Sequence, residues 1–286
     1  MCSSDLPAAW ARDCVLADKV RFAERCARME LPHPTTLAQV KGGRASVFGL
    51  ADSAELVAKH RAGTGGSGFQ LLKPPVVCLE SVEALKSWLE TEFDRSGEWI
   101  IQNRLTNHPD LRPVTLQALS TTRITTVLNE TGEPEIVAAL QRYAMVPDAL
   151  VDNASKGGFI SSVDPETGTL SAGRRGRSAG DVHTCHDSHP LTGARIAGRQ
   201  LPDWPNVRKL VTQAHRDAFA EYTMIGWDVA LTPTGPLLLE GNGKPNVLLN
   251  SRSMQSQAER DRFGELVALH LATRPDALDF RASSDY

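Results

Sequence analysis

The sequence predicts an α+β chain that folds as two lobes. Short apolar runs typical of strands alternate with segments of helical periodicity, and no long linker or internal repeat separates them. Along the chain we expect strands, a helix, further strands and then a large mixed section that contains a strongly apolar hairpin. Groups of strands and helices in this order are typical of the α+β class.

The N-terminal half supplies the first of these elements. Residues 5–31 have apolar side chains at helical spacing, and Pro32 and Pro34 end that helix. Two short runs with strand character follow within 37–58, and the glycine-rich stretch 63–68 suits neither a helix nor a strand. We then expect a helix over 82–93 and a buried strand over 98–105.

The C-terminal half supplies the larger lobe. Two β-rich runs within 120–146 are joined by a turn, and residues 150–205 are expected to be mainly loops. After these we expect, in order, a helix over 205–222, the apolar hairpin over 226–246 and a helix over 255–272.

Composition narrows the class of protein. The chain has 286 residues, 41% of them hydrophobic and 23% charged, which is ordinary for a globular protein. A net charge of −3 offers no basic surface for nucleic acid, and no apolar run is long enough for a transmembrane helix. The N-terminus has no signal-peptide pattern, and five scattered cysteines without a CxxC favour reduced thiols. We therefore expect a cytoplasmic protein that binds neither nucleic acid nor a membrane.

Three oxygen-bearing side chains lie at the end of the apolar hairpin. Asp228 is on its first run, and Glu240 and Asn242 are at the end of its second. Because alternate residues of a strand share a face, Glu240 and Asn242 can point the same way, and Asp228 can reach towards them from the neighbouring strand. Carboxylate and amide oxygens suit Mg²⁺, which takes its remaining ligands from water and phosphate. The alternative is a polar rim on a hydrophobic hairpin.

A lysine precedes the glycine-rich stretch. Lys59 ends a probable strand, and residues 63–68 follow it. Glycine-rich backbone lets N–H groups approach a phosphate closely, and a lysine adds positive charge. Such a stretch is often only a flexible connector, and this one is not a Walker A sequence because no GK[ST] ends it.

The order of these motifs resembles the ATP-grasp superfamily, and most closely its sugar-transfer-associated branch. The resemblance runs from about residue 17 to about residue 250 and is carried by five segments: LADKVRFAERCARMELPHPTTLA, LVAKHRAGTGGSGFQLL, EWIIQNRLTNHP, TTRITTVL with VAALQR and VDNASKGG, and IGWDVALTPTGPLLLEGNGKP. It implies two α+β lobes that grip ATP between them. The expected bounds are an N-terminal helix and lead-in segment at 1–45, a small lobe at 46–106, a large lobe at 107–280 and a tail at 281–286.

The resemblance also implies a role for individual residues. Lys19 and Lys59 match the lysines that family members direct at the nucleotide phosphates, and 63–68 matches a lid over them, comprising Gly63, Gly65, Gly66, Ser67 and Gly68. The adenine contacts match Gln102, Asn103, Arg104 and Leu105. Arg123 and Arg142 match basic positions at the site of phosphoryl transfer, and Asn153 and Lys156 match a loop over the acceptor. Asp228, Glu240 and Asn242 match ligands of Mg²⁺, with two ions expected and Mn²⁺ as a substitute.

The implied activity is ATP-dependent ligation of a carboxylate to an amine through an acyl phosphate, in the biosynthesis of a small peptide or an amino-acid-derived metabolite. Two alternatives remain open: a small-molecule kinase, and a nucleotide-binding module without turnover. The expected partners are the carboxylate and amine substrates, and a homodimer is also left open. Little sequence precedes the first family motif, so the sequence does not indicate how the acceptor site is built.

A histidine- and cysteine-containing stretch at 183–190 raises a separate question. His183, Cys185, His186 and His189 are all competent zinc ligands, but their spacing matches no standard zinc site. We therefore expect a surface loop here.

Overall fold

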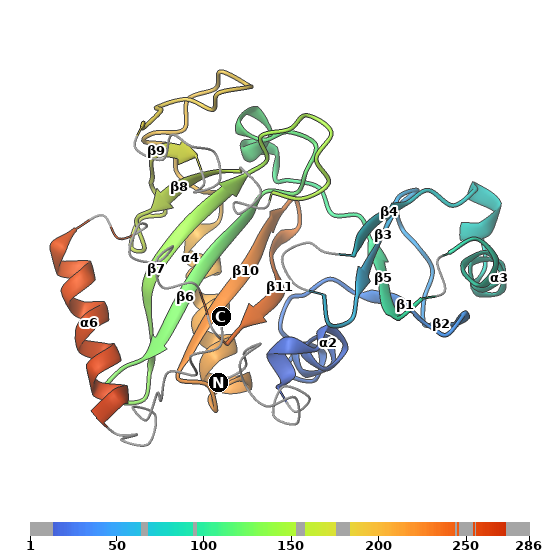
Figure 1. Ribbon diagram of the computed structural model, residues 1–286, viewed down its shortest axis with the longest axis horizontal. Helices are drawn as coiled ribbons and strands as arrows, with labels where there is room; N and C mark the ends of the chain where they lie inside the picture. Colours follow the sequence, from blue (N-terminus) through green and yellow to red (C-terminus); the bar gives the residue numbers. More distant parts are fainter. Residues whose placement is uncertain are drawn as a thin grey trace, which may run out of the picture.

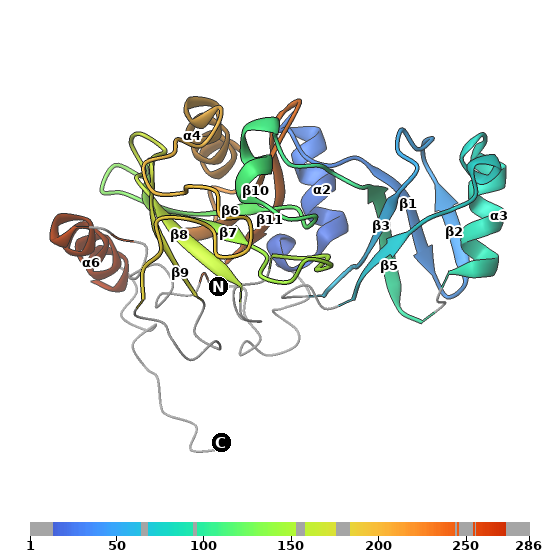
Figure 2. The same cartoon turned by 90° about the horizontal axis from the view of Figure 1, so that it is seen from above.

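The computed structural model describes residues 14–63, 68–93, 96–152, 158–175, 184–243, 245, 254 and 256–272. Two antiparallel sheets organise the chain, one of five strands in the order β2-β1-β5-β3-β4 and one of six in the order β11-β10-β6-β7-β8-β9. Each sheet forms one lobe with its own helices, as Figures 1 and 2 show. The predicted α+β class and two-lobed architecture are confirmed.

The small lobe packs its sheet on a single long helix. Its elements are β1 (Thr36–Lys41), β2 (Arg44–Val47), β3 (Leu56–His60), β4 (Phe69–Leu72), a 3-10 turn (Val76–Leu79), α3 (Val82–Glu92) and β5 (Glu98–Asn103). The Ser81 hydroxyl accepts from the Ala84 amide and so begins α3. Leu85 and Leu89 of α3 bury against Leu56 and Ile101 of the sheet. The other face of this sheet is left for the large lobe.

The large lobe carries helices on both faces of its sheet. Its elements are a 3-10 segment (Pro109–Val114), β6 (Thr121–Leu128), β7 (Pro134–Tyr143), β8 (Phe159–Val163), β9 (Leu170–Arg175), α4 (Trp204–Gln213) with a π turn (Ala214–Ala218), β10 (Met224–Thr232), β11 (Gly235–Asn242) and α6 (Gln257–Ala272). One core packs α4 beneath Ile124 and Trp227. A second packs Phe263 and Leu266 of α6 on Val137, and Figure 1 shows α6 beside β7.

The N-terminal helix belongs to the core of the large lobe. A 3-10 turn (Val15–Ala17) leads into α2 (Lys19–Arg28). Phe22 of α2 stacks on Phe219 with ring centroids 5.4 Å apart, and Cys26 is fully buried. The amide of Leu238 on β11 donates to the Pro32 carbonyl at 2.9 Å. The chain therefore passes from the large lobe to the small one between α2 and β1, and α2 lies between the lobes in Figures 1 and 2.

This path bears on the domain bounds that the sequence suggested. The expected boundary between residues 45 and 46 falls inside β2, and the five-stranded sheet starts at Thr36. We propose that the small lobe spans 36–106 and that the segment before it belongs with the large lobe. Residues 273–286, which include the expected 281–286 tail, lie outside the described residues.

Three sequence expectations differ from the structure. The segment 150–205 contains β8 and β9, whose short, serine- and glycine-containing runs lack a strong apolar alternation. The helix expected over 5–31 begins at Lys19 within the described part, because Asp18 caps it by accepting from the Val20 and Arg21 amides. The expectation of reduced thiols is wrong for Cys14, which is disulfide-bonded, whereas Cys26, Cys78 and Cys185 are free.

Among the described helices, none combines the length and the apolar character that a membrane span requires.

A buried polar chain joins β6 and β10 to the π turn. Trp227 Nε1 donates to Thr126 Oγ1 at 2.8 Å, and that hydroxyl lies 2.7 Å from His215 Nδ1. His215 Nε2 lies 2.7 Å from the Tyr222 carbonyl, which can only accept, so Nε2 carries the proton and Nδ1 accepts from Thr126. Burial lowers the pKa of His215, and the neutral ring satisfies every partner.

Replacing Thr126 tests this chain. Thr126→Val should lower the free energy of unfolding by about 3 kcal/mol, because it leaves the Trp227 N–H and His215 Nδ1 buried without partners. Urea unfolding at neutral pH measures the loss. Thr131→Val, at an exposed turn hydroxyl, is the control, for which we expect a change of less than about 1 kcal/mol. Equal effects of the two substitutions would contradict the assignment.

Candidate functional site

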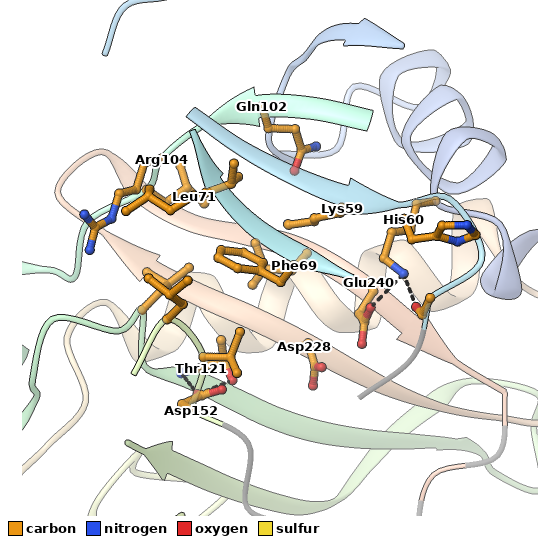
Figure 3. A pocket seen from close by; sticks show the side chains of 18 of the residues that line it. Lys59, His60, Phe69, Leu71, Gln102, Arg104, Thr121, Asp152, Asp228 and Glu240 are labelled. Carbon is orange, nitrogen blue, oxygen red and sulfur yellow. Dashed lines mark hydrogen bonds and ion pairs between the residues drawn. The ribbon is translucent and has the colours of Figure 1, made fainter. Parts of the chain in front are cut away.

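A cavity of about 220 Å³ lies between the two sheets, and both lobes line it. One part of its wall is apolar, made by Val57, Phe69, Leu71, Leu119, Leu150 and Leu239. Another part carries charged side chains from β3, β6, β7, β10 and β11. Figure 3 shows Leu71 and Phe69 towards Arg104, with Lys59, Glu240 and Asp228 further along the cavity.

Strand alternation directs Lys59 into the cavity. Leu56 and Ala58 on β3 are buried in the small-lobe core, so Val57 and Lys59 face the other way. Burial lowers the pKa of Lys59 to about 8, and the carboxylate of Glu240 opposes this effect. The ammonium is therefore charged at neutral pH but close to its titration range.

Asp228 is the most heavily engaged carboxylate of the cavity. It lies directly opposite Arg123 in the β10–β6 register, and its two oxygens accept from Arg123 Nε and, at 3.0 Å, from Arg123 Nη2. Arg142 Nη2 lies 2.8 Å from Asp228 Oδ1. Only 7% of the Asp228 side chain is exposed, so two guanidinium groups compensate one buried carboxylate.

A second carboxylate adjoins Asp228. Glu240 is opposite Asp228 in the β10–β11 register. Burial and then the charge of Asp228 raise the pKa of Glu240. Burial also opposes ionisation of Asp228, but Arg123 and Arg142 outweigh it and hold its pKa below the usual range. The two carboxyl groups therefore differ in environment: Asp228 stays ionised between two guanidinium groups, and Glu240 is the harder of the two to ionise.

The other side of Arg142 is held by a hydrogen-bond network. Arg142 Nε donates to Thr121 Oγ1 at 2.8 Å, and that hydroxyl donates to Asp152 Oδ2 at 2.7 Å. The Thr121 amide also donates to Asp152 Oδ2, at 2.6 Å. Burial raises the pKa of Asp152, and Arg142 opposes the rise. Sequence reasoning missed Thr121 and Asp152, although Asp152 directly precedes the loop that carries Asn153.

The segment 102–105 lines the cavity beside its apolar wall. Gln102 Nε2 donates to the Pro34 carbonyl at 3.2 Å, and its Oε1 is buried without a hydrogen-bond partner. Figure 3 shows this oxygen on the side of Lys59. Asn103 Oδ1 accepts from the Asp52 amide, and Arg104 pairs with Glu55. Gln102 therefore offers a bound group an acceptor, while the side chains of Asn103 and Arg104 already have partners.

The glycine-rich segment begins at the charged part of the cavity. Lys19 Nζ donates to the Gly63 carbonyl and lies 3.8 Å from a Glu240 carboxylate oxygen. Gly68 has φ +70°, and a Cβ there would lie 3.0 Å from that of His60, so this position requires glycine. Gly65, Gly66 and Ser67 lie outside the described residues.

The structure brings most of the sequence-predicted residues to one cavity. Its lining includes Lys19, Lys59, Gly63, Gln102, Asn103, Arg104, Leu105, Arg123, Arg142, Asp228, Glu240 and Asn242. Gly68 directly precedes β4 and is not part of this lining. Asn153 and Lys156 fall outside the described residues, so their place relative to the cavity is not given.

The oxygen donors at the hairpin end suit a hard divalent cation. Asn242 Nδ2 donates to the Gly226 carbonyl at 3.3 Å, which leaves Asn242 Oδ1 as its remaining acceptor beside Asp228 and Glu240. Within the described residues, no group of three or more His, Cys, Asp or Glu side chains forms a metal cluster. Two carboxylates and one amide fit Mg²⁺, which keeps several waters, better than a metal that needs a complete protein cage.

The histidine-containing loop has a structural use for His189. Its Nδ1 accepts from the Leu191 and Thr192 amides at 3.2 Å, and its Nε2 lies 3.3 Å from the Ala144 carbonyl. The ring also contacts Tyr143 and Phe159. Because both ring nitrogens are engaged, His189 does not fit a zinc site; His183 lies outside the described residues.

Comparisons with known proteins bear on this geometry. Residues 12–260 match the family described as sugar-transfer-associated ATP-grasp. A search of curated proteins gave no match.

Several solved structures are similar at low identity. An N5-carboxyaminoimidazole ribonucleotide synthetase from Thermotoga maritima has 13% identity and a TM-score of 0.43, over 81% of this chain and 43% of that one. A D-alanine–D-alanine ligase from Bacillus anthracis has 12% identity and a TM-score of 0.49, over 92% and 70%. A D-cycloserine synthetase has 17% identity and a TM-score of 0.49, over 93% and 73%. The chain spans less than half the length of the first of these proteins, and similarities of this size carry no argument about activity.

The network around Arg142 has a measurable energetic consequence. Arg142→Met should lower the free energy of unfolding by about 3–5 kcal/mol, because it removes the guanidinium that compensates Asp228 and Asp152. Adding Asp152→Asn should recover part of the loss, and a urea-unfolding double-mutant cycle measures the coupling. Arg208→Met, at an exposed pair with Glu166, is the matched control and should change stability by less than about 1 kcal/mol. Additive effects of the Arg142 and Asp152 substitutions would rule out the network.

Proposed function

Because the chain belongs to the sugar-transfer-associated ATP-grasp family, we propose that it is an ATP-dependent ligase that joins a carboxylate to an amine. The family match confirms the resemblance seen in the sequence. One observation carries the proposal: a single interlobe cavity combines an apolar wall with Lys19, Lys59, Arg123 and Arg142 and with the Asp228–Glu240–Asn242 set. A base, a triphosphate and a divalent cation each have matching groups in that cavity.

In this proposal the adenine lies against the apolar wall beside residues 102–105. The unpartnered Gln102 Oε1 supports this placement, because a buried acceptor is costly unless a ligand donor meets it. An exocyclic amino group is such a donor. Lys59 and Lys19 then face the phosphates, and the 63–68 segment covers them.

Asp228, Glu240 and Asn242 would hold Mg²⁺, with two ions expected and Mn²⁺ as a substitute. Bound Mg²⁺ would neutralise negative charge on the β- and γ-phosphates. Arg123 and Arg142 both contact Asp228 and line the same cavity, so their charges also face the transferred group.

The proposed chemistry has two steps. A carboxylate oxygen of the first substrate attacks the γ-phosphorus of ATP, and the bond from that phosphorus to the bridging oxygen breaks. ADP departs, and the first substrate is now an acyl phosphate. The amine then attacks the acyl carbon and loses a proton, and phosphate departs as the amide forms. The protein aligns the groups and compensates their charge, which is what phosphoryl transfer demands. Arg123 is proposed to stabilise the oxyanion of the second step.

The remaining assignments extend the proposal. The two substrates would be a small carboxylate and a small amine from the biosynthesis of a peptide or an amino-acid-derived metabolite. The loop that contains Asn153 and Lys156 would cover the acceptor. We also propose a cytoplasmic protein without a nucleic-acid partner. A homodimer is the oligomeric state to test.

A product screen tests the activity. The protein, ATP and Mg²⁺ are incubated with pairs of carboxylates and amines, phosphate release is measured, and products are analysed by mass spectrometry. An amide that forms with ADP and phosphate supports the ligase. A phosphorylated hydroxyl product would identify a kinase, and nucleotide binding without turnover across the panel would indicate a binding module.

Glu240 tests the metal assignment. Glu240→Gln should reduce kcat by about 10²-fold or more while the thermal unfolding temperature stays near that of the wild type, because it removes one of two carboxylate charges from the ligand set. Glu221→Gln, at an exposed pair with Arg25, is the control and should retain full activity. Near-full activity of Glu240→Gln with Mg²⁺ would show that Glu240 is not a ligand of the metal.

Lys59 makes nucleotide affinity depend on pH. Because burial lowers the pKa of Lys59 to about 8, the ammonium loses its proton as the pH rises through that value and with it the attraction for phosphate. The Kd for a nonhydrolysable ATP analogue should rise about tenfold between pH 7 and pH 9, with proton uptake on binding at the higher pH. Calorimetric titration in buffers of different ionisation enthalpy measures both. Lys59→Arg keeps its charge and should flatten the profile; an unchanged slope in that variant would contradict the assignment.

A further inference from the structure

One ion pair of the described residues crosses between the lobes at the phosphate end of the cavity. Asp18 precedes α2, which packs in the core of the large lobe through Phe22 and Cys26. Arg61 directly follows β3 of the small-lobe sheet. A contact between Asp18 and Arg61 therefore ties the two lobes together.

The geometry of this contact is that of a strong pair. Arg61 Nε lies 3.0 Å from Asp18 Oδ1 and 2.9 Å from Oδ2, and Arg61 Nη2 lies 2.6 Å from Oδ2. The Lys19 amide donates to the Arg61 carbonyl at 3.2 Å, which adds a backbone bond across the same junction. A forked guanidinium–carboxylate pair fixes direction as well as distance. With 34% of the Arg61 side chain and 20% of the Asp18 side chain exposed, the pair is partly shielded from water.

A second pair of Arg61 stays within the small lobe. Arg61 Nη1 lies 2.9 Å from Glu98 Oε2, and Glu98 is the first residue of β5. Arg61 thus has one carboxylate partner on each side of the junction. Replacing Asp18 removes an ion pair between the lobes, and replacing Glu98 removes one within the small lobe. A comparison of the two variants therefore separates the effect of the junction from the effect of losing any ion pair of Arg61.

The junction stands at the root of the glycine-rich segment. Lys59 is near the end of β3, and Arg61 and Gly63 follow the strand. Lys19 Nζ donates to the Gly63 carbonyl. Lys19 is also 3.8 Å from Glu240 on the large lobe. The junction therefore sets where the small-lobe lysine lies relative to the carboxylates of the large lobe.

We propose that Asp18 and Arg61 form a latch that holds the phosphate end of the two lobes together and so positions Lys59 and the root of the 63–68 segment for a nucleoside triphosphate. Both are positioning residues, since they act through Lys19, Lys59 and the segment root. The inference rests on the proposed function for its ligand, but the latch itself is a property of the nucleotide-free protein. If the latch is open for part of the time, the apparent affinity for the nucleotide is the intrinsic affinity multiplied by the fraction of molecules whose latch is closed. A saturated site reacts at the normal rate.

The first test needs no nucleotide. Asp18→Asn keeps the helix cap, because asparagine caps as well as aspartate, but removes the charge that Arg61 grips. The Lys19 amide should then exchange its hydrogen about five- to tenfold faster, whereas the capped amides of Val20 and Arg21 should be unchanged. Residue-resolved hydrogen exchange measures all three. Glu98→Gln is the matched control and should leave the Lys19 amide protected; equal exchange in the wild type and Asp18→Asn, or equal loss in both variants, would overturn the latch.

The second test uses kinetics. Asp18→Asn and Arg61→Gln should each raise the KM for ATP about tenfold with kcat changed by less than about twofold, and the double variant should be no worse than either single one. Glu98→Gln should keep the KM of the wild type. A fall in kcat at unchanged KM, or no change in either constant, would overturn the positioning role. If the wild type neither binds nor uses ATP, the proposed function fails, and the exchange experiment still decides whether the junction exists.

Discussion

The site is organised around one buried carboxylate. Asp228 lies on β10, beside β6 in the large sheet, and pairs with Arg123 from β6 and with Arg142 from the next strand, β7. A charge in this position is tolerated only when opposite charges are close, so three adjacent strands must keep their register for the protein to fold. The same constraint leaves a carboxylate ionised beside Glu240, ready for a cation. Stability and the proposed chemistry thus depend on the same contacts.

Charge balance across the cavity follows from that arrangement. The large lobe contributes Asp152, Asp228 and Glu240 together with Arg123 and Arg142. Lys19 comes from α2, and Lys59 comes from β3 of the small lobe. The three carboxylates of the large lobe face two guanidinium groups and the ammonium of Lys19, whereas Lys59 comes from the other lobe and has its pKa lowered by burial. A polyanion with a divalent cation would complete the balance. Because α2 belongs to the core of the large lobe, the Asp18–Arg61 ion pair connects the small lobe to the same core that carries these charges.

The sequence predicted the parts of this protein that depend on local pattern. The apolar hairpin predicted β10 and β11. The match of Arg123 to a family position predicted a place in the site, and Arg123 does line the cavity, whereas its neighbour Ile124 is in the core. Contacts between residues that are far apart in the chain could not be predicted from local pattern. The membership of α2 in the large-lobe core depends on Phe22 meeting Phe219, which is distant in the chain. Asp152 gains its place through Thr121 and Arg142, so no spacing rule marks it. The strands β8 and β9 lack the strong alternation that would distinguish them from loops.

The most direct test of this account is a crystal structure of the protein with a nonhydrolysable ATP analogue and Mg²⁺. We expect adenine against residues 102–105 with a donor on Gln102 Oε1, phosphates facing Lys19 and Lys59, and metal density in contact with Glu240. A nucleotide bound elsewhere, or a metal bound in the cavity without contact to Asp228, Glu240 or Asn242, would contradict it.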